Sequence, residues 1–181
     1  GRFGAVIHLT LDGNQLTGSI PSSLPNGLRR VEHLDLSANF ISGSLPVDIG
    51  NMRSLGNMLL NDNRITGPIP SSIGHIPYLQ LLDLTNNQMT GTIPEALGDN
   101  ANLITLKLAH NRLSGPLPES LHRLQLLEEL ALAENELVGG VPTIWGGMPS
   151  LRVLSAANNR LSGPLPFEWV HKLADFAAQT A

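Results

Sequence analysis

The sequence predicts an α/β repeat solenoid, and three columns of identical residues carry this prediction. An asparagine recurs with a period of 24 residues after a first step of 25, a glycine follows each asparagine four residues later, and a proline follows each glycine after three more. A fixed period of this length is typical of one structural unit stacked on copies of itself, because a single unit cannot bury its own apolar side chains. The columns consist of Asn14, Asn39, Asn63, Asn87, Asn111, Asn135 and Asn159, then Gly18, Gly43, Gly67, Gly91, Gly115, Gly139 and Gly163, then Pro21, Pro46, Pro70, Pro94, Pro118, Pro142 and Pro166.

The first part of each unit predicts a short strand with one buried face. Each unit reads L-x-x-L-x-L-x-x-N-x-L-x-G-x-[I/L/V]-P, so apolar residues alternate with variable ones. Leu34 and Leu36 are expected to point inward while Asp35 points outward. Side by side, these strands predict a parallel sheet. Each asparagine follows its strand, where its amide can donate to and accept from backbone groups of the turn. The column therefore predicts a buried structural amide ladder.

The second part of each unit predicts a turn, a second short strand and a helical turn. The glycine suits a positive φ or a close approach, and the proline suits the end of a strand, where a missing N–H costs least. Beyond it, apolar residues recur at a spacing of three, as in Ile73 and Ile76, which favours a 3₁₀ or helical turn on the convex side. The first unit carries one extra residue within 25–27, which we expect in a loop. The predicted segments are 1–5 and then the units 6–30, 31–54, 55–78, 79–102, 103–126, 127–150 and 151–174.

The repeat pattern fails after Pro166. Phe167, Trp169, Val170 and Leu173 lie at helical spacings, so a helix over 167–181 is expected to overlap the last unit and close the core. A helix that binds a membrane surface or a partner is the alternative, although two basic residues give little attraction to lipid.

The repeat resembles the leucine-rich repeat, and its G-x-I-P segment with the 24-residue period resembles the plant-type subclass of receptor-like kinases, receptor-like proteins and polygalacturonase inhibitors. The resemblance implies a right-handed superhelix with a concave parallel sheet, and an extracellular or cell-surface location. Such proteins usually open with a cysteine-paired cap, which this chain lacks, so the resemblance is to a fragment or a cap-less form. The chain has no cysteine and no N-x-S/T sequon, which leaves an intracellular or organellar location open.

Composition argues against several classes of function. The formal net charge is −4, and the only lysines are Lys107 and Lys172, so no basic stripe is available for nucleic acid. No apolar run approaches the roughly 20 residues that cross a bilayer, so we expect no direct membrane insertion. The repeat explains the glycines, which leaves no phosphate-binding loop, and we expect no cofactor.

The outward strand positions are the candidates for binding, since the other columns build the solenoid. The first four units present a polar, acid-leaning surface. The last three present a track of alanines edged by Glu128, Glu129 and Glu134. Small side chains let an extended peptide or a helix approach closely, and the acids could pair with a basic partner, although the alanines could equally be tolerated surface. The predicted contact residues are Asp35, Ser37, Leu59, Asn61, Asp83, Thr85, Lys107, Ala109, Ala131, Ala133, Glu134 and Ser155.

These positions predict a non-enzymatic module that recognises a protein or peptide. A structural subunit buried in a larger assembly is one alternative, and an inhibitor of a cell-wall enzyme such as polygalacturonase is another. His8 and His33 occupy the same outward position in neighbouring units, a row that we call a lane. Asp12 and Asp35 are near them, and this cluster is the one most similar to a metal or acid–base site. Because the face is open and lacks convergent polar groups, we expect solvated histidines, no metal and no catalysis.

Overall fold

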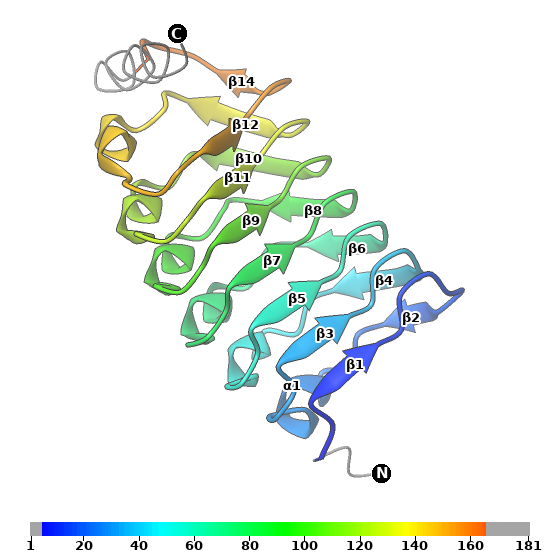
Figure 1. The fold of residues 1–181 in the computed structure, drawn as a ribbon. Coiled ribbons are helices and arrows are strands. Elements are labelled where there is room, and N and C mark those ends of the chain that lie inside the picture. The colour runs from blue at the N-terminus through cyan, green and yellow to red at the C-terminus, as the bar shows by residue number, and fades with distance from the viewer. Residues whose placement is uncertain (1–4, 166–181) are drawn as a thin grey trace, which may run out of the picture.

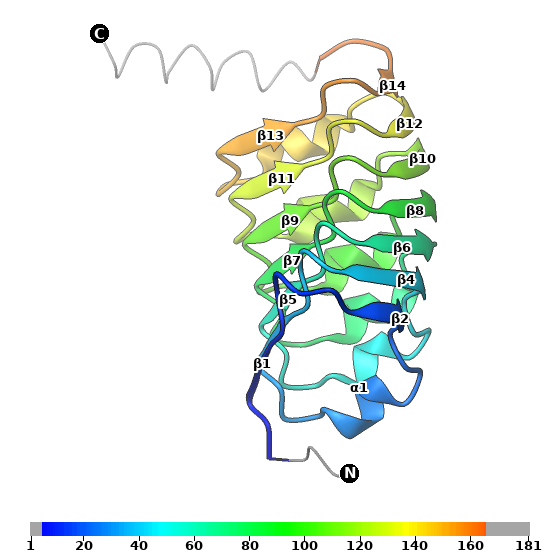
Figure 2. The same ribbon diagram turned by 90° about the vertical axis from the view of Figure 1, so that its right-hand side faces the viewer.

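The computed structural model describes residues 5–165, which wind into a solenoid with one wall of parallel strands and one wall of helical turns (Figures 1 and 2). The first sheet holds the strand of every unit, in sequence order. Its members are β1 (His8–Thr10), β3 (His33–Asp35), β5 (Asn57–Leu59), β7 (Leu81–Asp83), β9 (Thr105–Lys107), β11 (Glu129–Ala131) and β13 (Val153–Ser155). The prediction of an α/β solenoid is confirmed.

A second parallel sheet runs along the flank, followed by the helical turns. Its strands are β2 (Thr17–Ser19), β4 (Phe40–Ser44), β6 (Arg64–Gly67), β8 (Gln88–Gly91), β10 (Arg112–Pro116), β12 (Glu136–Gly139) and β14 (Arg160–Leu161). The turns are α1 (Leu24–Gly27) and the 3₁₀ helices η1 (Ile49–Asn51), η2 (Ser71–His75), η3 (Glu95–Asp99), η4 (Glu119–Arg123) and η5 (Thr143–Gly147). Both features follow the sequence prediction.

The apolar columns fill the space between the walls. Leu79, Leu82 and Leu84 of one unit are all 0% exposed, and the buried side chains join into one cluster along the solenoid. Ala156, which replaces the third leucine of the last unit, is half-buried against the same cluster. Each unit therefore stabilises its neighbours by covering their apolar side chains.

The asparagine column forms the predicted ladder. The Asn87 amide nitrogen donates to the carbonyls of Leu60 and Leu84 at 3.0 and 3.2 Å, and its oxygen accepts the Ile65 N–H at 2.9 Å. The amides of Asn39, Asn63, Asn111, Asn135 and Asn159 repeat this pattern. Asn14 differs because no described unit precedes it: it is exposed and bonds only to carbonyls of its own unit. The column is architecture, as predicted.

The extra residue of the first unit corrects one expectation. Residues 24–27 form the α-helix α1 rather than a loop. An α-helical turn takes 3.6 residues where a 3₁₀ turn takes about 3, so a change of helix type absorbs one added residue without a bulge. The helix predicted over 167–181 lies outside the described residues.

A second positive-φ column precedes the asparagines and was not predicted. Besides Gly13, the residues there are Ala38, Asp62, Asn86, His110, Glu134 and Asn158, with φ between 50° and 57°. This left-handed conformation brings Cβ close to the following carbonyl oxygen and costs about 1–2 kcal/mol for most residues. Asparagine and aspartate tolerate it best, whereas alanine has no side chain to compensate.

We therefore expect Ala38→Gly to raise the free energy of unfolding by about 0.5 kcal/mol, because relief of the left-handed strain outweighs the greater freedom of glycine in the unfolded chain. The urea midpoint provides the measurement. Ala101→Gly is the matched control: Ala101 is exposed and is absent from the positive-φ residues, so glycine should lower the midpoint there. A lower midpoint for both variants would contradict the interpretation.

Candidate binding surface on the first sheet

The register of the first sheet aligns the predicted contact residues across the strands. Asp35 pairs with Leu59, Leu59 with Asp83, and Asp83 with Lys107. The lane continues through Ala131 to Ser155. These side chains are half-buried, whereas the apolar residues that alternate with them in units two to six are buried. The sheet therefore presents one continuous row of variable side chains. We use the name concave face for this row and for the outward positions on either side of it.

Several polar side chains of this face also stabilise its turns. The Asp35 carboxylate accepts the Ser37 N–H at 3.0 Å and the Ser37 hydroxyl at 2.7 Å. Asp83 accepts the Thr85 N–H at 2.9 Å in the same way. In both residues the bonds use Oδ1, and Oδ2 makes no hydrogen bond among the described residues. Both aspartates are thus turn residues that retain an acceptor.

Hydrogen bonds join side chains of the next two outward columns, both within a unit and between neighbouring units. Asp62 accepts hydrogen bonds from the amides of Asn61 and Asn86 at 2.6 and 2.7 Å. Farther along, the Asn158 amide donates to the Glu134 carboxylate. Part of the acid-leaning charge is therefore already solvated by amides.

The alanine track is narrower than the sequence suggests. Ala109 is only 8% exposed, so its contribution to a contact is limited to a small part of its methyl group. Ala131 and Ala133 are half-buried. Lys107 lies beside the track and forms an ion pair with Glu129 at 3.1 Å, both side chains being about one-third exposed. The pair lies beside the track, whose accessible alanines are Ala131, Ala133 and the exposed Ala157.

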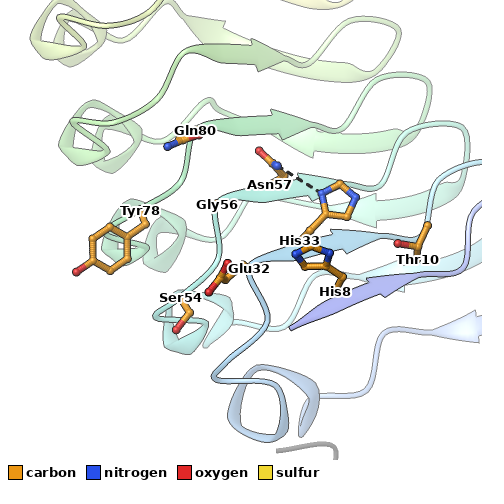
Figure 3. Close-up of a pocket in the computed structure, with 9 residues that line it drawn as sticks. All are labelled: His8, Thr10, Glu32, His33, Ser54, Gly56, Asn57, Tyr78 and Gln80. Atoms are coloured by element: carbon orange, nitrogen blue, oxygen red, sulfur yellow. Dashed lines mark hydrogen bonds between the residues drawn. The ribbon is translucent and has the colours of Figure 1, made fainter. Parts of the chain in front are cut away.

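A hollow of about 730 Å³ opens at the other end of the face (Figure 3). Its lining comes from the first four units: His8, Thr10, Glu32, His33, Ser54, Gly56, Asn57, Tyr78 and Gln80. Gly56 explains why the surface is hollowed there. It occupies the outward column between Glu32 and Gln80, so side chains stand on both sides of a position that has none.

The two histidines lie together at one side of the hollow. His8 pairs with His33 in the register, and their ring centroids lie 6.0 Å apart in an edge-on arrangement. The Asn57 amide nitrogen lies 3.4 Å from His33 Nδ1. Because that nitrogen can only donate, the bond requires His33 to carry its proton on Nε2. Within residues 5–165, no group of three or more histidine or carboxylate side chains could hold a metal ion.

The hollow and the predicted contact residues do not coincide. None of the twelve predicted residues lines it, and of the predicted cluster only the histidines do, without Asp12 or Asp35. Sequence reasoning missed Glu32, Tyr78 and Gln80 because it considered only the outward positions within the strands. The lining also includes positions just before each strand. The available signal was Gly56, a glycine outside every periodic column, so the expectation that the repeat explains the glycines was wrong at this position.

Comparisons with known proteins identify the class of the chain. A leucine rich repeat family model matches residues 53–113, 77–137 and 102–161, and another leucine rich repeat model matches residues 5–26 and 30–52. The chain therefore belongs to the leucine-rich repeat family. Its structural neighbours are plant receptor ectodomains, which agrees with the plant-type repeat of the sequence.

Three solved structures illustrate the similarity. The plant peptide hormone receptor RGFR1 in complex with RGF2 is 35% identical with a TM-score of 0.85, over 87% of this chain and 25% of that one. A TDR receptor is 32% identical with a TM-score of 0.88, over 91% and 28%. The Arabidopsis receptor kinase HAESA, in complex with the peptide hormone IDA and the co-receptor SERK1, is 35% identical with a TM-score of 0.86, over 92% and 28%.

The chain thus spans about a quarter of the length of these receptors. No curated protein sequence matches it. Among the helices of residues 5–165, none is long and apolar enough to cross a membrane.

Proposed function

We propose that this chain is a non-enzymatic recognition module that binds a peptide or protein along the concave face. The observation that carries the proposal is the separation of the residues into two groups. Those shared by all units are buried or bonded within the solenoid, whereas those facing outward from the first sheet differ from unit to unit. An open row of varied side chains on a rigid sheet suits an extended partner that contacts several units.

The relatives support the same function. RGFR1 and HAESA are both described in complex with a peptide, RGF2 and IDA respectively. An extracellular or cell-surface location would follow from the same relationship. We assign the contacts to the predicted set, namely Asp35, Ser37, Leu59, Asn61, Asp83, Thr85, Lys107, Ala109, Ala131, Ala133, Glu134 and Ser155.

Charge favours a basic partner. In the outward columns of units one to four, from Ile7 to Asn86, acidic residues occur at Asp12, Glu32, Asp35, Asp62 and Asp83, and lysine and arginine do not occur. A surface that carries only negative side chains attracts and orients a positively charged partner. The nearest basic group of the lanes, Lys107, is neutralised by Glu129.

The double variant Ala131→Arg with Ala133→Arg tests the alanine track. Two long side chains on its floor should exclude a backbone that lies flat there, so affinity should fall by at least tenfold, which is about 1.4 kcal/mol. The probe is a set of random twelve-residue peptides displayed on phage and selected on the unmodified chain, with affinities measured by titration of the selected peptides. The unfolding midpoint should hardly change because both positions face outward.

Ala101→Arg is the matched control, an exposed alanine after η3 on the opposite wall. It should leave peptide affinity unchanged. Equal affinity of the double variant and the control would reject the track as a contact, and failure to select any peptide would reject the proposed function.

The alternative of a structural subunit has one observation in its favour. Leu11 and Leu16 of the first unit are 41% and 39% exposed, whereas their equivalents in units two to six are buried. Exposed leucines at the end of a stack would be covered by another unit or by a partner protein. A chain that stays monomeric in sedimentation at high concentration would count against permanent assembly.

A further inference from the structure

We propose that the hollow around Gly56 binds the arginine side chain of a peptide that lies on the concave face. This inference rests on the proposed function and adds the chemistry of one contact. It is carried by the hydrogen-bond acceptors of the lining, by an exposed aromatic ring and by the gap that Gly56 leaves.

The lining offers acceptors without competing cations. Glu32 forms no ion pair with any residue of 5–165, so its carboxylate is available to a ligand. Gln80 and Ser54 add an amide oxygen and a hydroxyl. The Asn57 amide nitrogen is engaged with His33, which leaves its oxygen as a further acceptor. A guanidinium has five N–H donors and no acceptor, so it complements this set.

Tyr78 adds a contact that distinguishes arginine from a neutral ligand. Its side chain is 62% exposed and stands at one side of the hollow, across Gly56 from the histidines (Figure 3). A planar cation stacks on an aromatic face, and arginine does so while it also pairs in two-point fashion with a carboxylate. Tyr78 and Glu32 lining one hollow provide both partners.

The surrounding charge excludes an anionic ligand. The outward columns of the first four units carry aspartates and glutamate but no lysine or arginine. Arg30 precedes Ser54 and Tyr78 in their column, but it does not line the hollow. A ligand carboxylate would therefore meet Glu32 without a compensating cation, which is the costly arrangement.

The size of the hollow suits a peptide segment rather than an isolated ion. About 730 Å³ lies within the range of ligand pockets, roughly 300–1,000 Å³, and leaves room for the backbone on either side of one long side chain. His8, Thr10 and His33 belong to strands of the first sheet and also line the hollow, so the two are continuous. A peptide that runs across the ends of these strands can therefore place one side chain in the hollow.

The first experiment uses N-acetyl-arginine amide as the probe, titrated into ¹⁵N-labelled protein and followed by NMR. We expect saturable shifts of the Gly56, Asn57 and Gln80 amides. N-acetyl-citrulline amide has nearly the same shape without the charge, so it should bind at least tenfold more weakly. Equal binding of the two probes, or shifts centred on Glu129 and Glu134 instead, would overturn the proposal.

Two variants test the named groups. Glu32→Gln should weaken binding of the arginine probe about tenfold, whereas Glu128→Gln, the exposed glutamate in the same column of the sixth unit, should leave it unchanged. Gly56→Gln should abolish binding by filling the hollow. A Cβ at Gly56 would lie 3.5 Å from the Glu32 carbonyl and 3.7 Å from that of Tyr78, which are ordinary contacts, so the fold should persist with an unchanged melting temperature. Equal effects of Glu32→Gln and Glu128→Gln would reject the role of Glu32.

The selected phage peptides separate this inference from the proposed function. If they bind the concave face and are enriched in arginine at one position, and Glu32→Gln removes that enrichment, both stand. If they bind without any preference for arginine, the inference fails and the proposed function stands. If no peptide is selected, the proposed function fails first.

Discussion

Asn87→Ala is expected to lower the free energy of unfolding by about 3–4 kcal/mol, although Asn87 is not part of the proposed binding surface. The Asn87 amide makes hydrogen bonds to Leu60, Leu84 and Thr85 carbonyls and to the Ile65 N–H. The Leu60 and Leu84 carbonyls keep bonds from Asn63 and Asn111, since neighbouring amides share them. The Ile65 N–H has no such substitute and is left buried without a partner, which costs about 1–3 kcal/mol in addition to the lost bonds.

Asn14→Ala is the matched control because Asn14 belongs to the same column and is exposed. Its amide makes only two local bonds, to Leu11 and Asp12 carbonyls, so its loss should cost about 0.5–1 kcal/mol. Urea unfolding followed by circular dichroism measures both variants, and hydrogen exchange of the Ile65 amide reports the local effect. Similar destabilisation by the two variants would mean that burial of the ladder contributes little.

The period in the sequence predicted the parts of the fold that every unit repeats. Leu82 and Leu84 had to share one face because they are two residues apart in an extended strand. Asn87 had to satisfy backbone groups because it stands where the strand ends and the chain turns. Each such statement was tested by seven copies of the pattern, which is why the strands, the amide ladder and the 3₁₀ turns could all be predicted.

The hollow could not be predicted by the same reasoning, because it arises from residues that differ between units. Gly56 forms it because Glu32 and Gln80, one period before and one period after it, stand on either side. The period places the three residues side by side, but a column whose residues differ from unit to unit carries no repeated pattern that marks it as a site. The left-handed column was missed for a related reason. Ala38 and Glu134 have no side chain typical of positive φ, so the turn geometry imposes the conformation against local preference.

In the wall of helical turns, which we call the convex wall, a column of glycines allows neighbouring units to pack closely. A Cβ built on Gly74 in η2 would lie 2.1 Å from the carbonyl oxygen and 2.7 Å from the carbonyl carbon of Ala96 in the next turn. Gly50 and Gly98 meet Ser72 and Ser120 at 2.1 and 2.4 Å in the same way. These atoms belong to the backbone, so a side-chain rotation cannot relieve the overlap.

Gly74→Ala is therefore expected to destabilise the protein by about 3 kcal/mol or more, because the turns η2 and η3 must separate and expose the leucines between them. The reason is purely steric, since Gly74 is absent from the positive-φ residues and alanine suits its backbone. Gly147→Ala in η5 is the matched control: nothing lies within 4 Å of the position that its Cβ would take, so its unfolding midpoint should stay close to that of the unmodified chain. Urea unfolding of both variants decides the matter, and an unchanged midpoint for Gly74→Ala would show that the convex turns can separate at little cost, so that the spacing of the units is set by the two sheets alone.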